Sequence, residues 1–324
     1  MIISKTPFRI SLFGGGTDFP SFYKRHNGEV LSTTIDKYVY VIAKKRFDNN
    51  IRLGYSTTEN VSNLNNLKHE LAREAIKKVD VCGIEISTMA DIPGGSGLGS
   101  SSAVTVGLLH ILYAYKNKSI SKDMLVKEAI DIEINKLHKH IGIQDQIAVT
   151  YGGFNQIKFT NQQPHFNVFT FCSQDIVEEL EKNLLLFYTG NTRMATNILE
   201  EQNNNSEKNF NILIELLGLC KEAKYQLIKG NIEIIGTLLY ESWKLKKQLA
   251  SKITNNNIDE LYNFLIKNGV SGGKLLGAGG GGFILAFCLP DKQKKLLEET
   301  KIKNIQNLPF KFEKGGSRIV FNDQ

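Results

Sequence analysis

The stretch from Asp91 to Tyr115 reads DIPGGSGLGSSSAVTVGLLHILYAY and decides the expected fold. A strand-like segment, IEIST at 84–88, precedes it, and its second half is an apolar run of helical length. Glycines at 94, 95, 97 and 99 let backbone amides approach an anion without a Cβ in the way. The start of the following helix adds unpaired amides and the positive end of the helix dipole. The loop therefore predicts a phosphate site.

Three serines, at 100 to 102, directly follow the last of these glycines. Their hydroxyl groups suit phosphate oxygen or a magnesium ion. The P-loop pattern itself does not fit, because Ser100 stands where that pattern requires lysine. A flexible glycine turn is the alternative interpretation, and the serines and long helix that follow argue against it.

Two further glycine clusters lie far from this loop in the sequence. GGGTD at 14–18 ends the first predicted strand, and GAGGGG at 277–282 precedes another strand, FILAFCL. The second cluster formally matches a dinucleotide-binding G-x-G-x-x-G at Gly277, Gly279 and Gly282. That motif needs a strand before it and a helix after it, so we reject the match. Together, the three clusters predict one phosphate-rich site.

Two acids are candidates for chemistry at such a site. Glu133 occupies a polar position of an otherwise apolar helix, and Asp145 follows twelve residues later, just past Gly142. Phosphoryl transfer needs one acid to hold magnesium and another to accept the proton of the acceptor. On the sequence alone, either could instead be a surface carboxylate. His138 and His140 do not face each other on a helix, which argues against a zinc pair.

The rest of the chain reads as alternating strands and helices, which predicts an α+β protein. Its 324 residues are enough for two domains. From about Asp175 one strand is followed by helices broken at asparagine-rich segments, so we place the domains at 1–174 and 175–324. A helix is expected over 64–78, another follows a cap at Ser121, and a last strand reads SRIVF.

Composition excludes several classes of protein. With 41% hydrophobic and 23% charged residues, and no apolar run of about 18 residues, the chain predicts a globular protein without a membrane span. The N-terminal segment lacks signal-peptide features, which favours a cytoplasmic protein. The net charge of +7 comes from scattered lysines, which indicates solvated helix faces or a phosphorylated small molecule rather than nucleic acid. The four cysteines lie far apart in apolar runs and are expected to be reduced core thiols.

Four segments occur in the order found in a known family. They are RISLFGGGTDFPSFY at 9–23, PGGSGLGSSSA at 93–103, GIQDQIAVTYGGFN at 142–155 and KLLGAGGGGF at 274–283. Through them the chain resembles, over nearly its whole length, the GHMP kinases, which include galactokinase, homoserine kinase and mevalonate kinase. Within the family it most resembles the D-glycero-D-manno-heptose 7-phosphate kinases of bacterial surface-polysaccharide synthesis, through QDQIAVTYGGFNQI and LLLFYTGNTRMATNIL. The resemblance implies transfer of the ATP γ-phosphoryl group to the anomeric hydroxyl, which gives a 1,7-bisphosphate.

The resemblance also implies roles for individual residues. Asp145 is the expected base, and Arg9 lies beside it, where its charge would keep the carboxylate ionised. Ser101 and Glu133 are the expected magnesium ligands, and the triple serine leaves Ser102 open as an alternative to Ser101. The residues expected around the ATP phosphates are Gly95, Ser96, Gly97, Leu98, Gly99, Ser100 and Ser101. Those expected on the acceptor side are Gly15, Gly16, Thr17, Asp18, Arg193, Gly279, Gly280 and Gly281.

The acceptor pocket departs from that of galactokinases, which carry a glutamate and a histidine where this chain has Gly15 and Gly16, so galactose is a poor fit. Arg193 is the candidate for binding a phosphate on the acceptor, because a planar guanidinium suits bidentate phosphate binding. The alternative for Arg193 is a solvated arginine at a helix start.

The fold implied by the resemblance has an N-terminal domain like the second domain of ribosomal protein S5 and a ferredoxin-like C-terminal domain, with the site in the cleft between them. ATP and Mg²⁺ are the implied cofactors, a small sugar phosphate is the implied partner, and the oligomeric state stays open. Two other functions also stay open: a kinase of an unphosphorylated sugar such as fucose, and an ATP-binding sensor without activity. The presence of Glu133, Asp145 and Arg9 argues against the sensor.

Overall fold

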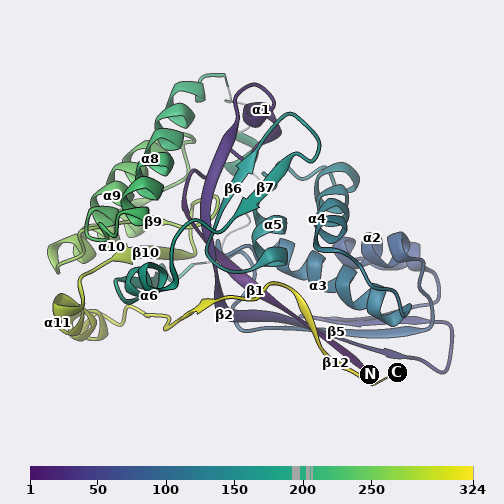
Figure 1. Ribbon diagram of the computed structural model, residues 1–324. Helices are drawn as coiled ribbons and strands as arrows, with labels where there is room; N and C mark the ends of the chain where they lie inside the picture. Colours follow the sequence, from purple (N-terminus) through teal and green to yellow (C-terminus); the bar gives the residue numbers. More distant parts are fainter. Residues whose placement is uncertain (192–197, 202–204, 206, 324) are drawn as a thin grey trace.

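The computed structural model describes residues 1–191, 198–201, 205 and 207–323. It contains two β-sheets, each packed against helices, and the two halves of the chain lie side by side (Figure 1). Helices and strands occur together in both halves, so the α+β prediction is confirmed.

The larger sheet is built mainly from the first half of the chain. Its main path runs β12-β1-β2-β5-β3-β4, with β11 and β6 also paired to β2 and with β7 paired to β6. Neighbouring strands are antiparallel except β3 and β5, which are parallel. The strands are β1 (Ile2–Phe13), β2 (Gly28–Lys45), β3 (Ile51–Gly54), β4 (Thr58–Val61), β5 (Ile84–Ala90), β6 (Asn155–Phe159), β7 (Phe166–Phe169), β11 (Phe312–Glu313) and β12 (Arg318–Asn322).

Strand β2 organises this sheet because it is long enough to pair with several strands in succession. Its first part pairs with β6, its last part pairs with β5, and β1 follows it from Leu31 to Ala43. Residues 28–35 of β2 are all buried, which explains why this part of its sequence shows little alternation of polar and apolar residues. Asn49 and Asn50 lie in the turn between β2 and β3.

Most helices of the first half of the chain lie on one face of the larger sheet (Figure 1). Helix α3 packs directly on β1 and β2 and is buried along most of its length, as its apolar sequence predicts. The Ser121 side chain accepts a hydrogen bond from the Met124 amide, so the predicted helix cap is confirmed. The helices are α1 (Pro20–Tyr23), η1 (Leu64–Asn66, a 3₁₀ turn), α2 (Glu70–Val79), α3 (Ser100–Tyr115), α4 (Lys122–Ile130), η2 (Asp131–Lys136, a π-helical segment) and α5 (Gln144–Tyr151).

The helix expected from about Leu64 begins later, at Glu70. The Glu59 carboxylate accepts hydrogen bonds from the backbone amides of Lys68 and His69. Because these amides already have a partner outside the helix, α2 starts only after them.

The smaller sheet comes from the second half of the chain and has the strand order β8-β10-β9. Every residue of β10 is buried, which agrees with the apolar strand predicted there. Helix α8 packs against β1 and β2 of the larger sheet and so joins the two halves. The elements are α6 (Gln174–Lys182), β8 (Leu184–Tyr188), α8 (Phe210–Ile228), α9 (Ile234–Lys246), α10 (Asn256–Lys267), β9 (Gly272–Leu275), β10 (Phe283–Phe287) and α11 (Pro290–Ile302).

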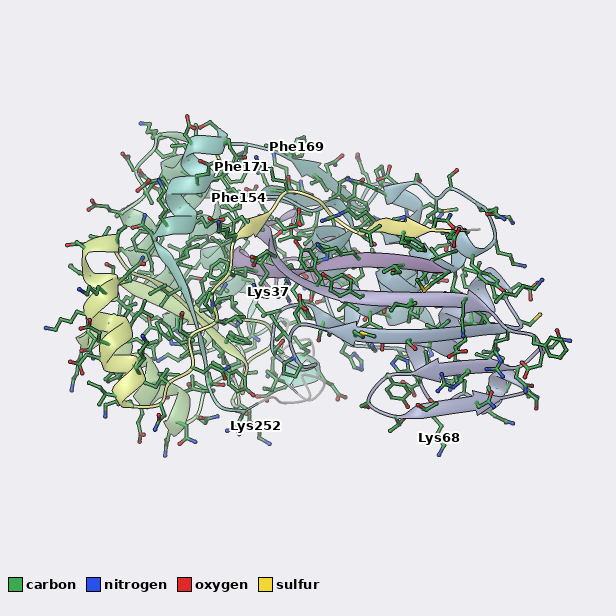
Figure 2. All side chains as sticks on the ribbon, turned by 90° about the horizontal axis from the view of Figure 1, so that it is seen from below. Lys37, Lys68, Phe154, Phe169, Phe171 and Lys252 are labelled. Atoms are coloured by element: carbon green, nitrogen blue, oxygen red, sulfur yellow. The ribbon has the colours of Figure 1, made fainter. Side chains whose placement is uncertain are left out.

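After α11 the chain returns to the larger sheet, where β11 pairs with β2 and β12 pairs with β1. At this return Phe312 stacks on Phe154, with ring centroids 6.1 Å apart. Phe171, just before the chain enters α6, packs on the same ring with centroids 5.1 Å apart (Figure 2). The two passages between the halves therefore lie together. The division at 174 stays a prediction, and the later segment adds two strands to the first sheet, which the sequence did not indicate.

Two predictions made from composition concerned the cysteines, expected to be core thiols, and the absence of a membrane span. All four cysteines are free, but only Cys220 and Cys288 are buried, whereas Cys172 is partly exposed and Cys82 is exposed. The prediction of four core thiols is wrong for Cys82 because it lies in the turn between α2 and β5. Among the described helices, none is both long enough and apolar enough to cross a membrane.

Candidate active site

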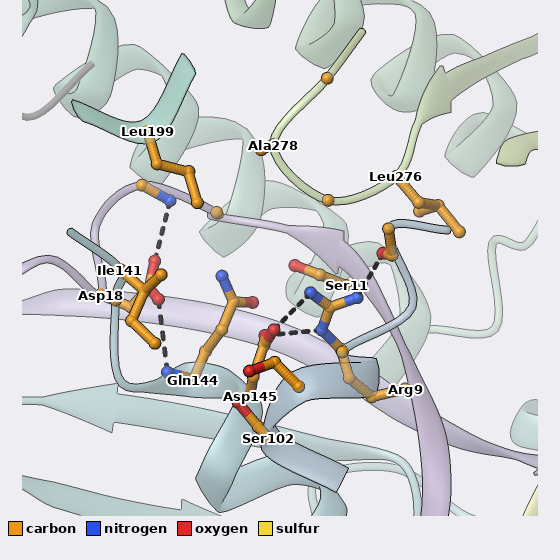
Figure 3. Close-up of a pocket in the computed structure, with 18 of the residues that line it drawn as sticks. Arg9, Ser11, Asp18, Ser102, Ile141, Gln144, Asp145, Leu199, Leu276 and Ala278 are labelled. Atoms are coloured by element: carbon orange, nitrogen blue, oxygen red, sulfur yellow. Dashed lines mark hydrogen bonds and ion pairs between the residues drawn. The ribbon is translucent and has the colours of Figure 1, made fainter. Parts of the chain in front are cut away.

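A cavity of about 620 Å³ lies between the two halves of the chain (Figure 3). The end of β1, the loops before α3, α5 and β10, and residues of α8 and α9 line it. Residues of all three glycine clusters reach this one cavity, together with Arg9 and Asp145. Segments that are far apart in the sequence thus meet at a single site.

The phosphate loop, defined here as residues 94–101, turns sharply at its glycines. Gly95, Gly97 and Gly99 have φ angles of 75°, 79° and 78°. These values lie in the left-handed region, which favours glycine. Helix α3 starts at Ser100, and no side chain caps its N-terminus. The first amides of α3 are therefore available to bind an anion.

Not every residue of the phosphate loop faces the cavity. The side chains of Ser96 and Leu98 are completely buried and do not line it. The Leu98 carbonyl accepts a hydrogen bond from the Arg9 amide at 3.0 Å, which ties the loop to β1. Ser96 and Leu98 can therefore reach a ligand only through their backbone. The cavity-lining residues of the loop are Gly94, Gly95, Gly97, Gly99, Ser100 and Ser101.

The third glycine cluster packs against the phosphate loop, backbone against backbone. A Cβ atom on Gly97 would lie 2.6 Å from the Leu276 carbonyl oxygen, and a Cβ atom on Gly277 would lie 2.5 Å from the Gly97 Cα. Only glycine permits this approach. Strand β10 follows the cluster, as predicted. A dinucleotide-binding motif would need a helix at this position.

The other glycines of this cluster have different surroundings. Gly279 and Gly281 line the cavity, whereas Gly280 does not. The Gly280 amide donates a hydrogen bond to the Ile253 carbonyl at 2.9 Å, which holds the cluster to the segment after α9. Gly280 thus supports the loop from behind.

Glu133 forms the centre of a polar cluster beside the phosphate loop. It lies in η2 and is completely buried. Its carboxylate accepts hydrogen bonds from Ser101 Oγ at 2.5 Å, Ser102 Oγ at 2.8 Å and Gln146 Nε2 at 2.7 Å. The Lys139 ammonium donates to Ser101 Oγ at 2.8 Å and lies 3.4 Å from Glu133 Oε1. The oxygens of Ser101 and Glu133 therefore share one cationic group, so they fit a cation such as Mg²⁺.

The sequence predicted an ordinary helix around Glu133, but the structure has a π-helical segment there. A π-helical turn contains an additional residue, so it changes the direction of the side chains that follow it. Such turns are rare and are frequently found at functional sites. No pattern in the sequence indicated it.

We expect Ser101→Ala to raise the Mg²⁺ concentration needed for half-maximal activity and Ser102→Ala to leave it nearly unchanged. The reason is that both serines line the cavity but only Ser101 is exposed, whereas Ser102 is buried. The measurement is a Mg²⁺ titration of the initial rate for both variants at saturating ATP. If only Ser102→Ala raises this Mg²⁺ concentration, Ser102 is the ligand. If neither variant raises it, the metal binds elsewhere.

Arg9 holds Asp145 at the end of the phosphate loop. Arg9 Nε and Nη2 donate to the two carboxylate oxygens at 2.7 Å and 2.8 Å, and Arg9 Nη1 donates to the Gly97 carbonyl at 2.7 Å. The two side chains are 5% and 24% exposed, so the guanidinium is enclosed while the carboxylate still reaches the cavity. One guanidinium thus fixes the carboxylate beside the loop by a bidentate contact (Figure 3).

Asp18 joins the first glycine cluster to the loop before α5. Its two oxygens accept hydrogen bonds from the amides of Gly16 at 2.9 Å and Gln144 at 3.3 Å. A Cβ atom on Gly142 would lie 1.8 Å from Asp18 Oδ2, so glycine is required there. Burial, followed by the negative charge of Asp145, raises the pKa of Asp18 to about 6.

The remaining residues of the first glycine cluster divide between the cavity and the interior. Gly15 and Gly16 line the cavity. Thr17 is completely buried, and its hydroxyl donates to the carbonyls of Gly14 and Glu29. Thr17 therefore shapes the loop and does not reach the cavity. Arg193 lies outside the described residues.

Comparisons with known proteins agree with this geometry. The profile of the GHMP kinases N terminal domain matches residues 65–153, and the profile of the GHMP kinases C terminal domain matches residues 223–304. The two matches include the phosphate loop, Glu133, Asp145 and the third glycine cluster. The chain belongs to the GHMP kinases. It is an ATP-dependent sugar kinase, a phosphotransferase that acts on a hydroxyl group.

Individual relatives of this GHMP kinase cover most or all of its length. It is 29% identical to a D-glycero-alpha-D-manno-heptose 7-phosphate kinase from Campylobacter jejuni over 97% of both chains. It is 27% identical to an L-fucokinase/L-fucose-1-P guanylyltransferase from Bacteroides fragilis over 88% of this chain and 34% of that protein. The crystal structure of a D-glycero-D-manno-heptose 1-phosphate kinase from Bacteroides thetaiotaomicron has a TM-score of 0.82 and 23% identity, with both chains fully covered. This last likeness shows the fold.

The structure also brings residues to the kinase cavity that the sequence had not singled out. Ser11 Oγ and Gln144 Oε1 are buried, line the cavity, and have no hydrogen-bond partner among the described residues. Ser11 follows Arg9 by two positions on β1, so the period of a strand places both on one face. That spacing could have identified Ser11. Lys246 and Lys274 also line the cavity, although Lys274, the first residue of the segment quoted at 274–283, had been given no role.

Proposed function

We propose that this kinase transfers the γ-phosphoryl group of ATP to the anomeric hydroxyl of D-glycero-D-manno-heptose 7-phosphate, which gives the 1,7-bisphosphate. The observation that carries the proposal is the Asp145 carboxylate, held by Arg9 at the end of the phosphate loop and open to the cavity. The heptose 7-phosphate kinase relative, which matches nearly the whole chain, supports the acceptor. We also propose that the protein is cytoplasmic, which agrees with ATP as its co-substrate.

In this proposal Asp145 accepts the proton of the attacking hydroxyl. Arg9 holds both oxygens of this carboxylate by hydrogen bonds, and the carboxylate still reaches the cavity where the hydroxyl would lie. The glycine amides of the phosphate loop and the first amides of α3 hold the ATP phosphates. Ser101 and Glu133 would hold Mg²⁺, which neutralises phosphate charge when it is bound.

On the acceptor side, Asp18, Ser11 and Gln144 offer oxygen atoms to sugar hydroxyls. Each has free acceptor capacity, because Ser11 Oγ and Gln144 Oε1 are unpaired in the described part of the chain and the carboxylate oxygens of Asp18 each have a second lone pair. Gly15 and Gly16 leave room for the sugar ring beside them. Gly279 and Gly281 close the opposite wall.

The proposal is tested by measuring ATP consumption with a panel of sugars and sugar 7-phosphates. Phosphorus NMR of the product then assigns the position of the new phosphate. We expect turnover with D-glycero-D-manno-heptose 7-phosphate and a second phosphate on the anomeric carbon. A product phosphorylated at another carbon would contradict the proposed reaction.

A kinase of unphosphorylated fucose is the second candidate, because 88% of the chain matches part of an L-fucokinase/L-fucose-1-P guanylyltransferase. The two candidates differ in whether the acceptor already carries a phosphate. Equal turnover of free heptose or fucose and heptose 7-phosphate would favour the fucose-type kinase.

Arg193→Ala is expected to raise the KM for heptose 7-phosphate at least tenfold and to leave the KM for ATP little changed. Removing one partner of a buried charge-assisted contact typically costs about 2 to 5 kcal/mol. The measurement is steady-state kinetics with heptose 7-phosphate and with free heptose. An unaltered acceptor KM would contradict a phosphate-binding role for Arg193.

A further inference from the structure

Lys246 and Lys274, which we call the lysine pair, line the cavity from the second half of the chain. Lys246 is the last residue of α9, and its ammonium donates to the carbonyls of Leu275 at 2.7 Å and Gly277 at 2.6 Å. Lys274 lies in β9 and donates to the Leu12 carbonyl at 3.0 Å. Within the described residues, neither ammonium has a carboxylate within ion-pair distance.

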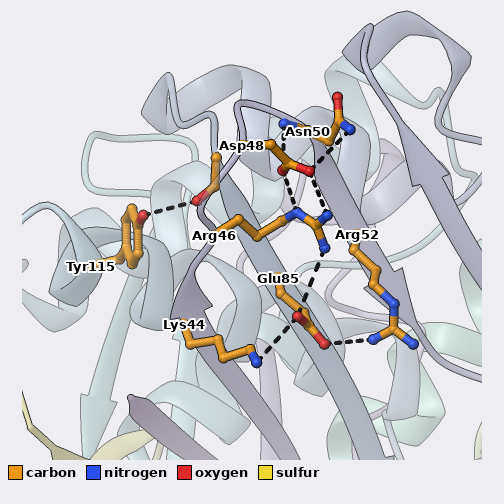
Figure 4. Close-up of polar contacts among 8 residues, drawn as sticks. Lys44, Arg46, Asp48, Asn50, Arg52, Glu85 and Tyr115 are labelled. Carbon is orange, nitrogen blue, oxygen red and sulfur yellow. Dashed lines mark hydrogen bonds and ion pairs between the residues drawn. The ribbon is translucent and has the colours of Figure 1, made fainter.

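A group of cationic side chains that lie close together on the surface does have carboxylate partners. On the surface beside β2, the Glu85 carboxylate pairs with Lys44 at 3.4 Å and Arg52 at 2.5 Å (Figure 4). Asp48 likewise pairs with Arg46 at 2.6 Å. These cations are matched by acids even though water could solvate them. The lysine pair is more enclosed and has no acid, so its positive charge lacks a partner in the protein.

The enclosure of the lysine pair has an electrostatic cost. Lys274 is only 4% exposed. Burial, followed by repulsion from Arg9, lowers its pKa to about 8. Burial and repulsion from Lys274 and Arg9 also lower the pKa of Lys246 well below its ordinary value. A bound anion would reverse this effect because it favours the charged form of both groups.

Both ammonium groups also have N–H donors that are not used in hydrogen bonds to the described residues. A lysine ammonium has three N–H donors, and the described structure uses two on Lys246 and one on Lys274. The unused donors suit the several acceptor oxygens of a phosphate group. Ser242, one helical turn before Lys246 on α9, lines the same part of the cavity and adds a hydroxyl.

We propose that Lys246 and Lys274 form the subsite that binds a phosphate group already present on the acceptor. ATP has its own binding groups in the first half of the chain, namely the phosphate loop, the start of α3 and the Ser101–Glu133 cluster. The lysine pair comes from the opposite half, where Ser242 and Leu216 complete the wall. This inference rests on the proposed function, because it needs an acceptor that is phosphorylated before the reaction.

The test compares two acceptors that differ only in the phosphate, heptose 7-phosphate and free heptose. For the wild type we expect a higher kcat/KM with heptose 7-phosphate. Lys246→Met and Lys274→Met should each lower this preference at least tenfold, mainly through the KM for heptose 7-phosphate, and should leave the KM for ATP within about twofold. Lys247→Met, at the exposed neighbouring position, is the matched control and should keep the preference.

Two further variants separate binding from structure. Lys246→Arg and Lys274→Arg keep the positive charge, so they should recover part of the preference that the methionine variants lose. Thermal unfolding of every variant identifies those that are merely destabilised.

Three outcomes would overturn the inference. If the methionine variants slow both acceptors equally, the lysine pair serves the transferred γ-phosphoryl group or the glycine loop instead. If they keep the full preference for heptose 7-phosphate, the acceptor phosphate is bound elsewhere, as the Arg193 prediction expects, while the proposed function stands. If the wild type itself shows no preference for a phosphorylated acceptor, the proposed function fails as well.

Discussion

Asp145→Asn is expected to reduce kcat by about 100- to 10,000-fold, the usual contribution of a general base. Asparagine keeps the size of the side chain and can still accept a hydrogen bond from Arg9, but it cannot take up a proton. The phosphate loop is untouched, so the affinity for ATP should stay within a few fold. The measurements are steady-state kinetics and calorimetric binding of a non-hydrolysable ATP analogue.

Asp123→Asn is the matched control for this variant. Asp123 also lies in the first turn of a helix, α4, but its partner is the Tyr151 hydroxyl, and it does not line the cavity. This control should retain wild-type turnover. An Asp145→Asn enzyme that keeps more than about a tenth of wild-type turnover would show that positioning and charge suffice without a base.

Glu133→Gln is the second large expected effect. It should lower kcat at least 100-fold and raise the Mg²⁺ requirement, since it removes the buried carboxylate that would hold the metal. The amide also presents N–H groups to donors from Ser101, Ser102 and Gln146. Such a mismatch typically costs about 1 to 3 kcal/mol of folding stability, so thermal unfolding should be followed together with the Mg²⁺ titration.

Glu128→Gln provides the comparison for Glu133→Gln. Glu128 is also buried and lies on α4, five residues earlier, but its hydrogen-bond partner is the Tyr113 hydroxyl, outside the cavity. It should lose stability without a change in Mg²⁺ dependence. If both variants shift the Mg²⁺ requirement equally, the effect of Glu133 comes from folding and not from metal binding.

The parts of this site that the sequence indicated are the local ones. The phosphate loop could be predicted because its glycines, its serines and the start of α3 lie within a few residues of one another. The helix cap at Ser121 could be predicted for the same reason. Arg9 and Asp145, 136 residues apart, were connected only through the family resemblance.

The parts that the sequence did not indicate depend on contacts between distant segments. Lys246 and Lys274 look like ordinary lysines in their local surroundings, and only the packing of α9 and β9 against the first half encloses them. The short strand β11 has little pattern of its own, and β12 could not be assigned to a sheet before its partner β1 was known. The π-helical turn at Glu133 likewise has no known sequence signature here.

The pairing of β12 with β1 has a consequence for how the protein is made. Residues 318–322 leave the ribosome after every other helix and strand described above, yet they pair with residues 2–5. The amides and carbonyls along this edge of β1 therefore stay unpaired until residues 318–322 have been synthesised. Domains generally fold as units during synthesis, starting at the N-terminus. Here the first sheet can close only after translation has passed through the second half, so until then this edge can pair with a strand of another chain.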